Sequence, residues 1–414
     1  MKLLFHLHDL ALGWYDGSNG SGGGDPGAAF IGTEGTLFGA EALASARLAP
    51  RAFNQDHWQA LNADPLSQTA PGLQNNADLV YRHLQTLYEP WAGRNPEAVV
   101  IAVPGGHSTD QLGMLLGIAQ EVGIPVCGFV DAALLYARTA ALPERAYCIE
   151  VYLRRAVVTE LSCADARLQR ADATVVPRIG QLQLIDGWLD QLVDRFVADS
   201  RFDPLRVAET EQQLFDQVRA WLLDTRRDAL AVEITHQGST RAVRIEAEEL
   251  LERAQVRYSE IERPLAPGST VVLGPIAATL PGLAAFLSSR GHRTLDADER
   301  GLALSLTACP ELFATSEAGV QFSSAVPYAA TPAAPSPTLE PAATHFVDAE
   351  HLARPLDAFA NGIAALDAAY GWRAPAASVR VNGAPVAPGR ALVPGDVLEA
   401  GDERVTCIRL SDGT

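Results

Sequence analysis

The segment that most constrains the fold is an apolar run that ends in a glycine. Residues 270–273 read TVVL, which is typical of a buried strand, and Gly274 follows directly. Beyond a short turn, the sequence predicts that Pro281 opens a helix. A glycine between a strand and a helix lets the backbone approach a ligand closely, because no side chain stands in the way. The segment therefore predicts an internal strand with a candidate binding position at its end.

Apolar runs alternate with amphipathic segments through much of the chain. Residues 97–103 and 125–130 predict buried strands, and residues 76–91 and 108–122 predict helices, the second with Ser108 as its N-cap. This alternation indicates an α/β fold. The other predicted elements are two strands within 2–16, a hairpin and helix start at 30–43, a helix at 131–141, a strand pair at 147–161, helices at 182–225 interrupted near Asp203–Pro204, a hairpin at 230–245 and a charged helix at 245–262.

Charge and hydropathy exclude several kinds of partner. The 414 residues carry 50 acidic side chains against 32 lysines and arginines, a formal net charge of −18. Such a surface repels nucleic acid and anionic lipid, so we expect neither as a partner. No apolar run approaches the roughly 20 residues that span a bilayer, so we expect no membrane insertion. The N-terminal run is broken by His6, His8 and Asp9, unlike a signal peptide, and five scattered cysteines predict the free thiols of a cytoplasmic protein.

The chain changes character after residue 325. Residues 326–343 are rich in proline and alanine and predict a semi-rigid linker. Short strands follow within 378–410, punctuated by turns at Asn382–Gly383, Pro394–Gly395 and Gly401–Asp402. We therefore expect a small all-β module at 344–414.

Residues 1–325 resemble the ATPase domain of the DnaK-type heat-shock chaperones. The similar segments, in the family's order, are GAAFIGTEGTLFGAEAL at 27–43, VVIAVPGGHSTDQLGMLLGIAQEVGIPVCGFVDAALLYA at 99–137, VRIEAEELLERA at 243–254, VVLGPIAATLPGLAAFL at 271–287 and LDADERGLALSLTA at 295–308. The resemblance implies a two-lobed actin-like (ribonuclease H-like) ATPase fold. Lobe I would comprise residues 1–145 with a closing helix at 298–325, and lobe II would comprise residues 146–297.

The residues that would hold ATP or ADP with Mg²⁺ depart from the family pattern. The first phosphate loop of the family is an Asp-x-Gly-Thr hairpin, whereas this chain reads FHLHDLALG with Asp9 in the turn. The second, Asp-x-Gly-Gly-Gly-Thr in the family, is Glu150-Val-Tyr-Leu-Arg-Arg here. Side chains at these positions would collide with a phosphate that needs bare backbone amides. The adenosine turn keeps Gly274, but Pro275 stands where a second glycine is usual. These losses argue against hydrolysis and make a bound nucleotide doubtful.

A weaker match concerns the helix that flanks adenine in the family, Glu-x-x-Lys-x-x-Leu-Ser. The corresponding residues here are Asp216, Arg219, Leu222 and Leu223. An ordinary amphipathic helix with a charge pair three residues apart explains the same pattern.

Two local clusters suggest a functional site but also have a simpler structural explanation. His6 and His8 face the same side of a strand and, with Asp9, could bind a metal, but a surface or satisfied core pair is the commoner situation. The turn Pro104–Ser108 could suggest a hydrolase loop, but it lacks a Gly-x-Ser-x-Gly elbow. A helix cap by Ser108 is the simpler interpretation.

The predicted β module is similar to the end of forkhead-associated domains, which have Val-Asn-Gly and Leu-x-x-Gly-Asp turns. Phosphothreonine readers of that family also need an upstream arginine and a Ser-x-x-His loop. Residues 344–377 contain His351 and Arg354 but no such loop. A generic small barrel uses the same turns, because two-residue hairpins require positive φ.

Three functional hypotheses follow from these patterns. The first is a non-catalytic, actin-like pseudo-ATPase that binds protein partners and carries the β module as a tethered interaction domain. The second is a divergent ATP-binding switch whose cleft is lined by five residues: Asp9, Glu150, Asp216, Arg219 and Gly274. The third is a phosphopeptide-binding adaptor that acts through the β module.

Overall fold

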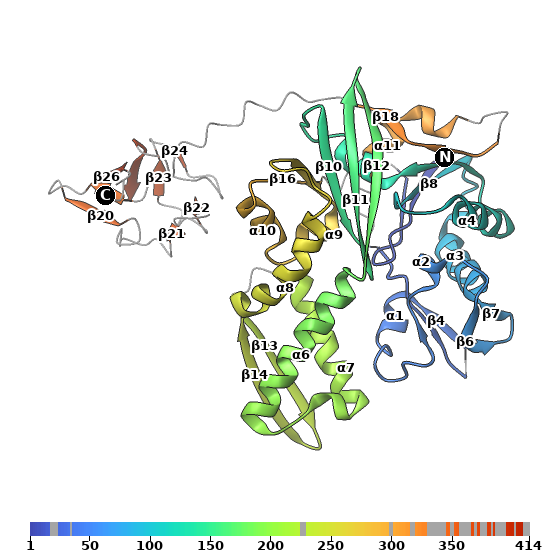
Figure 1. Ribbon diagram of the computed structural model, residues 1–414, viewed down its shortest axis with the longest axis horizontal. Helices are drawn as coiled ribbons and strands as arrows, with labels where there is room; N and C mark the ends of the chain where they lie inside the picture. Colours follow the sequence, from blue (N-terminus) through green and yellow to red (C-terminus); the bar gives the residue numbers. More distant parts are fainter. Residues whose placement is uncertain are drawn as a thin grey trace. The chain divides into compact units, whose positions relative to one another are not determined.

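The computed structural model shows a mixed α/β chain that divides into two compact units, Met1–Thr331 and Pro332–Thr414 (Figure 1). The residues that the structure describes are 1–16, 24–33, 35–223, 229–297, 301–314, 319–328, 345–347, 352–355, 366–367, 371–372, 379–381, 384–385, 395–400 and 403–408.

Two large sheets organise the first unit, and both contain the same strand pattern. In each, three neighbouring parallel strands are followed by an antiparallel hairpin partner: β9, β8, β1 and then β2 in one, and β16, β15, β10 and then β11 in the other. The order of the first sheet is β17 (Gln321–Ser323), β9 (Val126–Asp131), β8 (Ala98–Val103), β1 (Lys2–His6) and β2 (Gly13–Tyr15). The order of the second sheet is β16 (Arg293–Asp296), β15 (Thr270–Leu273), β10 (Arg145–Val151), β11 (Arg155–Ala164), β12 (Arg167–Pro177) and β18 (Ala325–Pro327).

Helices cover these sheets and supply their outer layers (Figure 1). The cap residues predict where they start: Asn75 caps α3 and Ser108 caps α4, each in a reciprocal capping box. The helices are α1 (Gly39–Leu43), α2 (His57–Ala60), α3 (Asn76–Ala92), α4 (Thr109–Val122), α5 (Ala132–Ala137), α6 (Gln181–Ser200), α7 (Ala208–Leu223), α8 (Ala247–Glu262), α9 (Pro275–Thr279), α10 (Leu283–Ser289) and α11 (Gly301–Ala308), with 3-10 turns η1 (Pro204–Arg206) and η2 (Pro310–Phe313).

The two sheets share one apolar core. Every residue of α5 is buried, and this short helix packs with α11 between the sheets. Leu4 and Val100 of the first sheet and Cys148 and Val272 of the second belong to that same cluster. Separate cores lie on the outer faces, one with α3 and α4 and one with α6, α7 and α8. The sheets are therefore packed as one body rather than as independent domains.

Smaller sheets extend the two halves of this unit. The hairpin β13 (Ala229–His236) and β14 (Ser239–Glu246) packs on α6, α7 and α8. On the other side, near α1 and α3 in Figure 1, lie a three-stranded and a two-stranded sheet. Their strands are β3 (Ala29–Ile31), β4 (Thr36–Phe38), β5 (Phe53–Asn54), β6 (Pro65–Ala70) and β7 (Leu73–Asn75).

In the second unit, the described residues form a six-stranded and a two-stranded sheet. The first has the order β20 (Ala353–Pro355), β19 (His345–Val347), β26 (Glu403–Ile408), β25 (Val397–Ala400), β23 (Val379–Val381) and β24 (Ala384–Pro385), and the second pairs β21 (Leu366–Asp367) with β22 (Gly371–Trp372). The predicted turns at 382–383 and 401–402, Pro394, the loop 17–23 and His351 lie outside the described residues.

Several element boundaries differ from the sequence prediction. Pro281 does not open a helix: α9 begins at Pro275, and Pro281 falls between α9 and α10. Proline suits the first helical position, because its missing N–H would have no intrahelical partner there. The helix expected at 298–325 is shorter, since α11 ends at Ala308 and β17 follows. The exposed strand β12 was not predicted at all. No helix among the described residues is long and apolar enough to cross a membrane.

Candidate functional site

The candidate site is the junction where the turn after β1 meets the turn between β10 and β11. The backbone N–H of Leu153 donates to Asp9 Oδ1 at 2.9 Å, and the ring of His8 stacks on Tyr152 with centroids 4.3 Å apart. Asp9, His8 and Tyr152 are all buried. The two hairpins are thus joined directly by protein contacts.

The N-terminus of α6 closes the same turn from the other side. The backbone N–H groups of Gln181 and Leu182 donate to the carbonyls of Tyr152 and Leu153, each at 2.9 Å. These are first-turn amides, which would otherwise lack partners and could hold an anion. A Cβ placed on Gly180 would lie 2.4 Å from the Leu153 carbonyl oxygen, so only glycine permits this approach. The turn therefore occupies the position that an anion would take at this helix end.

Burial raises the pKa of both acidic groups of the junction. Glu150 is buried, and desolvation together with the nearby Asp131 carboxylate raises its pKa to about 8. The Tyr152 hydroxyl donates to Glu150 Oε1 at 2.7 Å. Desolvation raises the pKa of Asp9 to about 6, against the opposing effects of the Leu153 amide and the Arg155 charge.

The histidines of the junction are held neutral for the same reason. Burial lowers the pKa of His6 to about 3 and that of His107 to about 4. Burial, with His6 and Arg155 nearby, also lowers the pKa of His8 well below its usual value. His6 Nε2 lies 2.8 Å from the Tyr136 hydroxyl. His6 and His8 are thus engaged with Tyr136 and Tyr152, respectively.

Five buried polar atoms around this junction have no hydrogen-bond partner among the described residues. They are Asp9 Oδ2, Glu150 Oε2, Arg155 Nε, Thr159 Oγ1 and His107 Nε2. Because the set mixes donors with acceptors, ordered internal waters suit it better than a single ion. Among the described residues, no group of three or more His, Cys, Asp or Glu side chains is arranged to hold a metal.

The turn after β8 adds a third contact between the two sheets. Gly105 and Gly106 approach β11 and β12 so closely that a Cβ on Gly106 would lie 2.4 Å from Val175 Cγ2. Arg170 of β12 donates from Nη1 to the Gly105 carbonyl at 3.2 Å and to Asp131 Oδ2 at 3.1 Å. The Pro104–Ser108 turn is therefore used for packing and, through Ser108, for capping α4.

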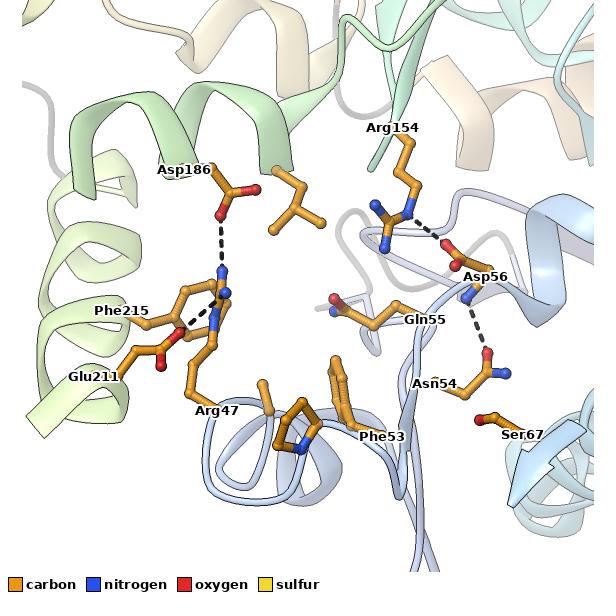
Figure 2. A pocket seen from close by; sticks show the side chains of 13 residues that line it. Arg47, Phe53, Asn54, Gln55, Asp56, Ser67, Arg154, Asp186, Glu211 and Phe215 are labelled. Atoms are coloured by element: carbon orange, nitrogen blue, oxygen red, sulfur yellow. Dashed lines mark hydrogen bonds and ion pairs between the residues drawn. The ribbon is translucent and has the colours of Figure 1, made fainter. Parts of the chain in front are cut away.

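An open cavity of about 390 Å³ lies between the loop after α1 and the helices α6 and α7 (Figure 2). Its rim carries bridging ion pairs: Arg47 reaches Asp186 of α6 at 2.8 Å and Glu211 of α7 at 3.3 Å. Gln212 strengthens this bridge, since its side chain accepts from the Arg47 amide and donates to the Leu43 carbonyl. On the opposite rim, Arg154 pairs with Asp56.

The structure brings together some of the five residues proposed to line a cleft. A Cβ on Gly274 would lie 3.4 Å from Glu150 Cγ, and the charge of Arg155 acts on both Glu150 and Asp9. Asp216 and Arg219 lie elsewhere, on α7, where their contacts are with Gln212 and Phe215 of the same helix. Desolvation raises the pKa of Asp216 and lowers that of Arg219.

Sequence reasoning missed three parts of the site. Gly180 belongs to no recognisable sequence motif. Its role depends on the β10–β11 turn, which ends 26 residues earlier in the chain. Arg47 and Gln212 are ordinary polar residues in sequence, 165 positions apart. A glycine directly before a long amphipathic helix was the one available signal.

No protein-family model matches the chain, and no curated protein is significantly similar to it.

Proposed function

We propose that this chain is a nucleotide-independent, actin-like pseudo-ATPase that serves as a protein-interaction scaffold. The repeated strand pattern of the two large sheets supports the two-lobed part of this proposal. Each lobe of an actin-like protein places a hairpin at the nucleotide, and here the corresponding hairpins are β1–β2 and β10–β11.

The observation that carries the proposal is the closed β10–β11 turn. Its carbonyls accept from the α6 amides, its Leu153 N–H donates to Asp9, and Tyr152 is only 1 % exposed. Phosphoryl chemistry needs a preorganised cradle of donors and a metal. In this chain the donors that would form such a cradle are already bonded to protein atoms. A triphosphate would have to break these contacts and expose the apolar core beneath them.

A scaffold role suits this chain, because its first unit is held closed by protein contacts and is joined to a second unit. The bridging ion pairs of Arg47 and the shared core hold the first unit in one arrangement. We propose that residues 344–414 act as a tethered interaction domain and that partners are proteins. The high negative charge keeps nucleic acid out of this set.

Calorimetry of the full chain with ATP and Mg²⁺ tests nucleotide independence. We expect no heat of binding up to about 1 mM nucleotide and no phosphate release above background. Micromolar binding with turnover would contradict the proposal and favour a divergent ATP switch.

The scaffold role is tested separately by capturing partners from a lysate on the immobilised full chain. The captured set should be the same with Mg²⁺-ATP as with EDTA. Release of partners by nucleotide, or the absence of any reproducible partner, would overturn this part.

A further inference from the structure

The cavity shown in Figure 2 has the size of a small-molecule site. Its volume of about 390 Å³ falls within the roughly 300–1,000 Å³ that is usual for ligand pockets. It adjoins the buried junction through Arg154 and Leu182, and its walls come from distant parts of the first unit. They are the loop and strand at 46–56, Ser67 of β6, Arg154 of the β10–β11 turn, and α6 and α7.

One wall of the cavity presents an unused cationic fork. Among the residues that the structure describes, Arg154 bonds to Asp56 through Nε alone, and its two terminal amino groups point toward the cavity in Figure 2. Such a fork matches the two oxygens of a carboxylate. The side-chain amide of Gln55 points into the same space and has no hydrogen bond among the described contacts. This wall suits an anionic group that also accepts a hydrogen bond.

The opposite wall is negative. Asp186 and Glu211 each contact Arg47 through one carboxylate oxygen, and Asp186 is 50 % exposed. In Figure 2 the second oxygen of Asp186 faces the cavity. Counting Asp56, three carboxylates line the cavity against two guanidinium groups. A dianionic phosphate is disfavoured by this balance, whereas a cationic group is attracted to Asp186.

Apolar side chains also line the cavity. They belong to Ala46, Pro50, Phe53, Leu182 and Phe215. A ligand that fits all three regions carries a carboxylate, an ammonium group and a short apolar body.

We propose that this cavity binds a small zwitterion of the amino-acid class. Its carboxylate pairs with the Arg154 fork, its ammonium group faces Asp186, and its side chain lies on Phe53 and Leu182. Because the cavity is lined from both halves of the first unit, such a ligand would reinforce the bridge that Arg47 makes.

Calorimetry of the full chain with L-leucine, N-acetyl-L-leucine and L-leucinamide tests this site. We expect leucine to bind with a Kd below about 1 mM, and each derivative to bind roughly tenfold or more weakly, since each lacks one charged group. No heat with leucine at about 10 mM would overturn the proposal. Equal binding of the derivatives, or binding of inorganic phosphate in place of leucine, would overturn it as well.

Two variants tie the binding to the cavity. Arg154→Gln should weaken leucine roughly tenfold, whereas Arg195→Gln should leave it unchanged. Arg195 is a matched control, because it is 39 % exposed against 41 % for Arg154 and pairs with Glu249 at 2.7 Å outside the cavity. Asp186→Asn provides an independent check if Arg154→Gln fails to fold. It should abolish the preference for leucine over N-acetyl-leucine, and an unchanged preference would contradict the assigned orientation.

Discussion

At the scale of single residues, Gly180 shows how a missing side chain shapes the site. Its φ of −128° is available to any residue, so its role is purely steric. A Cβ there would lie within 2.5 Å of the Arg154 amide nitrogen and 2.4 Å of the Leu153 carbonyl oxygen. These are backbone atoms that cannot rotate away. The glycine is required because α6 must approach the β10–β11 turn closely.

Gly180→Ala should therefore destabilise the protein by about 1–3 kcal/mol, the usual cost of overpacking a tight site. Urea unfolding followed by circular dichroism measures this. Gly113→Ala is the control, since a Cβ at that exposed position in α4 meets nothing within 4 Å. It should be neutral or stabilise by about 0.5–1 kcal/mol. A Gly180→Ala protein as stable as wild type would refute the close approach.

Glu150 makes the stability of the protein depend on pH. Its pKa is raised to about 8 in the folded protein from an ordinary 4.5. The resulting stabilisation is complete below the unfolded pKa and is lost as pH rises through the folded pKa. Glu150→Gln keeps an acceptor for the Tyr152 hydroxyl and removes the titration. Relative to wild type, this variant should gain at least about 1 kcal/mol between pH 5 and pH 8.

Unfolding in urea at both pH values, for wild type and Glu150→Gln, measures that difference. Glu160→Gln is the control, because Glu160 is only partly buried and pairs with Arg145 on the sheet surface. It should not change the pH dependence. If the stability difference between Glu150→Gln and wild type is the same at both pH values, Glu150 is not protonated in the folded protein.

The structure places Asp9 in the turn after β1, Glu150 in β10 and Gly274 directly after β15. These three residues could be singled out from the sequence through the resemblance to the family's phosphate and adenosine loops. The Leu153 amide, the Tyr152 carbonyl and Gly180 could not, since a backbone contact between separate segments leaves no residue-type signature. Tyr152 was visible as an obstacle to phosphate, but its stacking on His8 was not.

At the scale of elements, the outer edge of β13 is covered in an unusual way. Gln217 of α7 accepts from the Glu233 amide at 3.0 Å and donates to the Glu233 carbonyl at 2.8 Å. Gln213 makes the same pair of bonds to Thr235. The two side-chain amides are one helical turn apart and match alternate residues of the strand. They take the place of a neighbouring strand and so protect an edge that could otherwise pair with another chain.

Replacing both glutamines by leucine should expose this edge and promote self-association. In size-exclusion chromatography with light-scattering detection, the double variant Gln213→Leu/Gln217→Leu should elute with a larger mass than the wild type, as dimers or larger species. Gln120→Leu on α4 adds a comparable apolar group at an exposed helical position and serves as the control. A double variant with the same mass distribution as wild type would show that the edge needs no cover.

Element predictions succeeded where the residue pattern was strong. The six residues of β8 are all buried and apolar, and the capping box of α4 is explicit in Ser108 and Gln111. The element predictions failed where the residue pattern was weak. In β12 most side chains are exposed and the apolar alternation is lost, so the strand is defined by its pairing with β11 rather than by its own sequence. Pro275 was interpreted only as a departure from the family's second glycine, whereas it starts α9.

At the scale of the whole molecule, the chain combines a closed α/β unit with a second unit rich in strands. The α/β class was predictable from strand–helix alternation. The closure of the first unit was not, because it depends on pairs such as Arg47 with Asp186 and Asp9 with Leu153, which lie 139 and 144 residues apart. Such distant contacts are specified by the fold and not by local sequence.

We propose that protein contacts, and not a nucleotide, close the junction of the two hairpins. Hydrogen exchange at the amides of Leu153, Gln181 and Leu182 tests this, since these three N–H groups donate to Asp9, Tyr152 and Leu153. We expect these amides to be strongly protected in the nucleotide-free protein and Mg²⁺-ATP to leave their exchange unchanged. Rapid exchange without nucleotide, with protection gained on adding Mg²⁺-ATP, would contradict it.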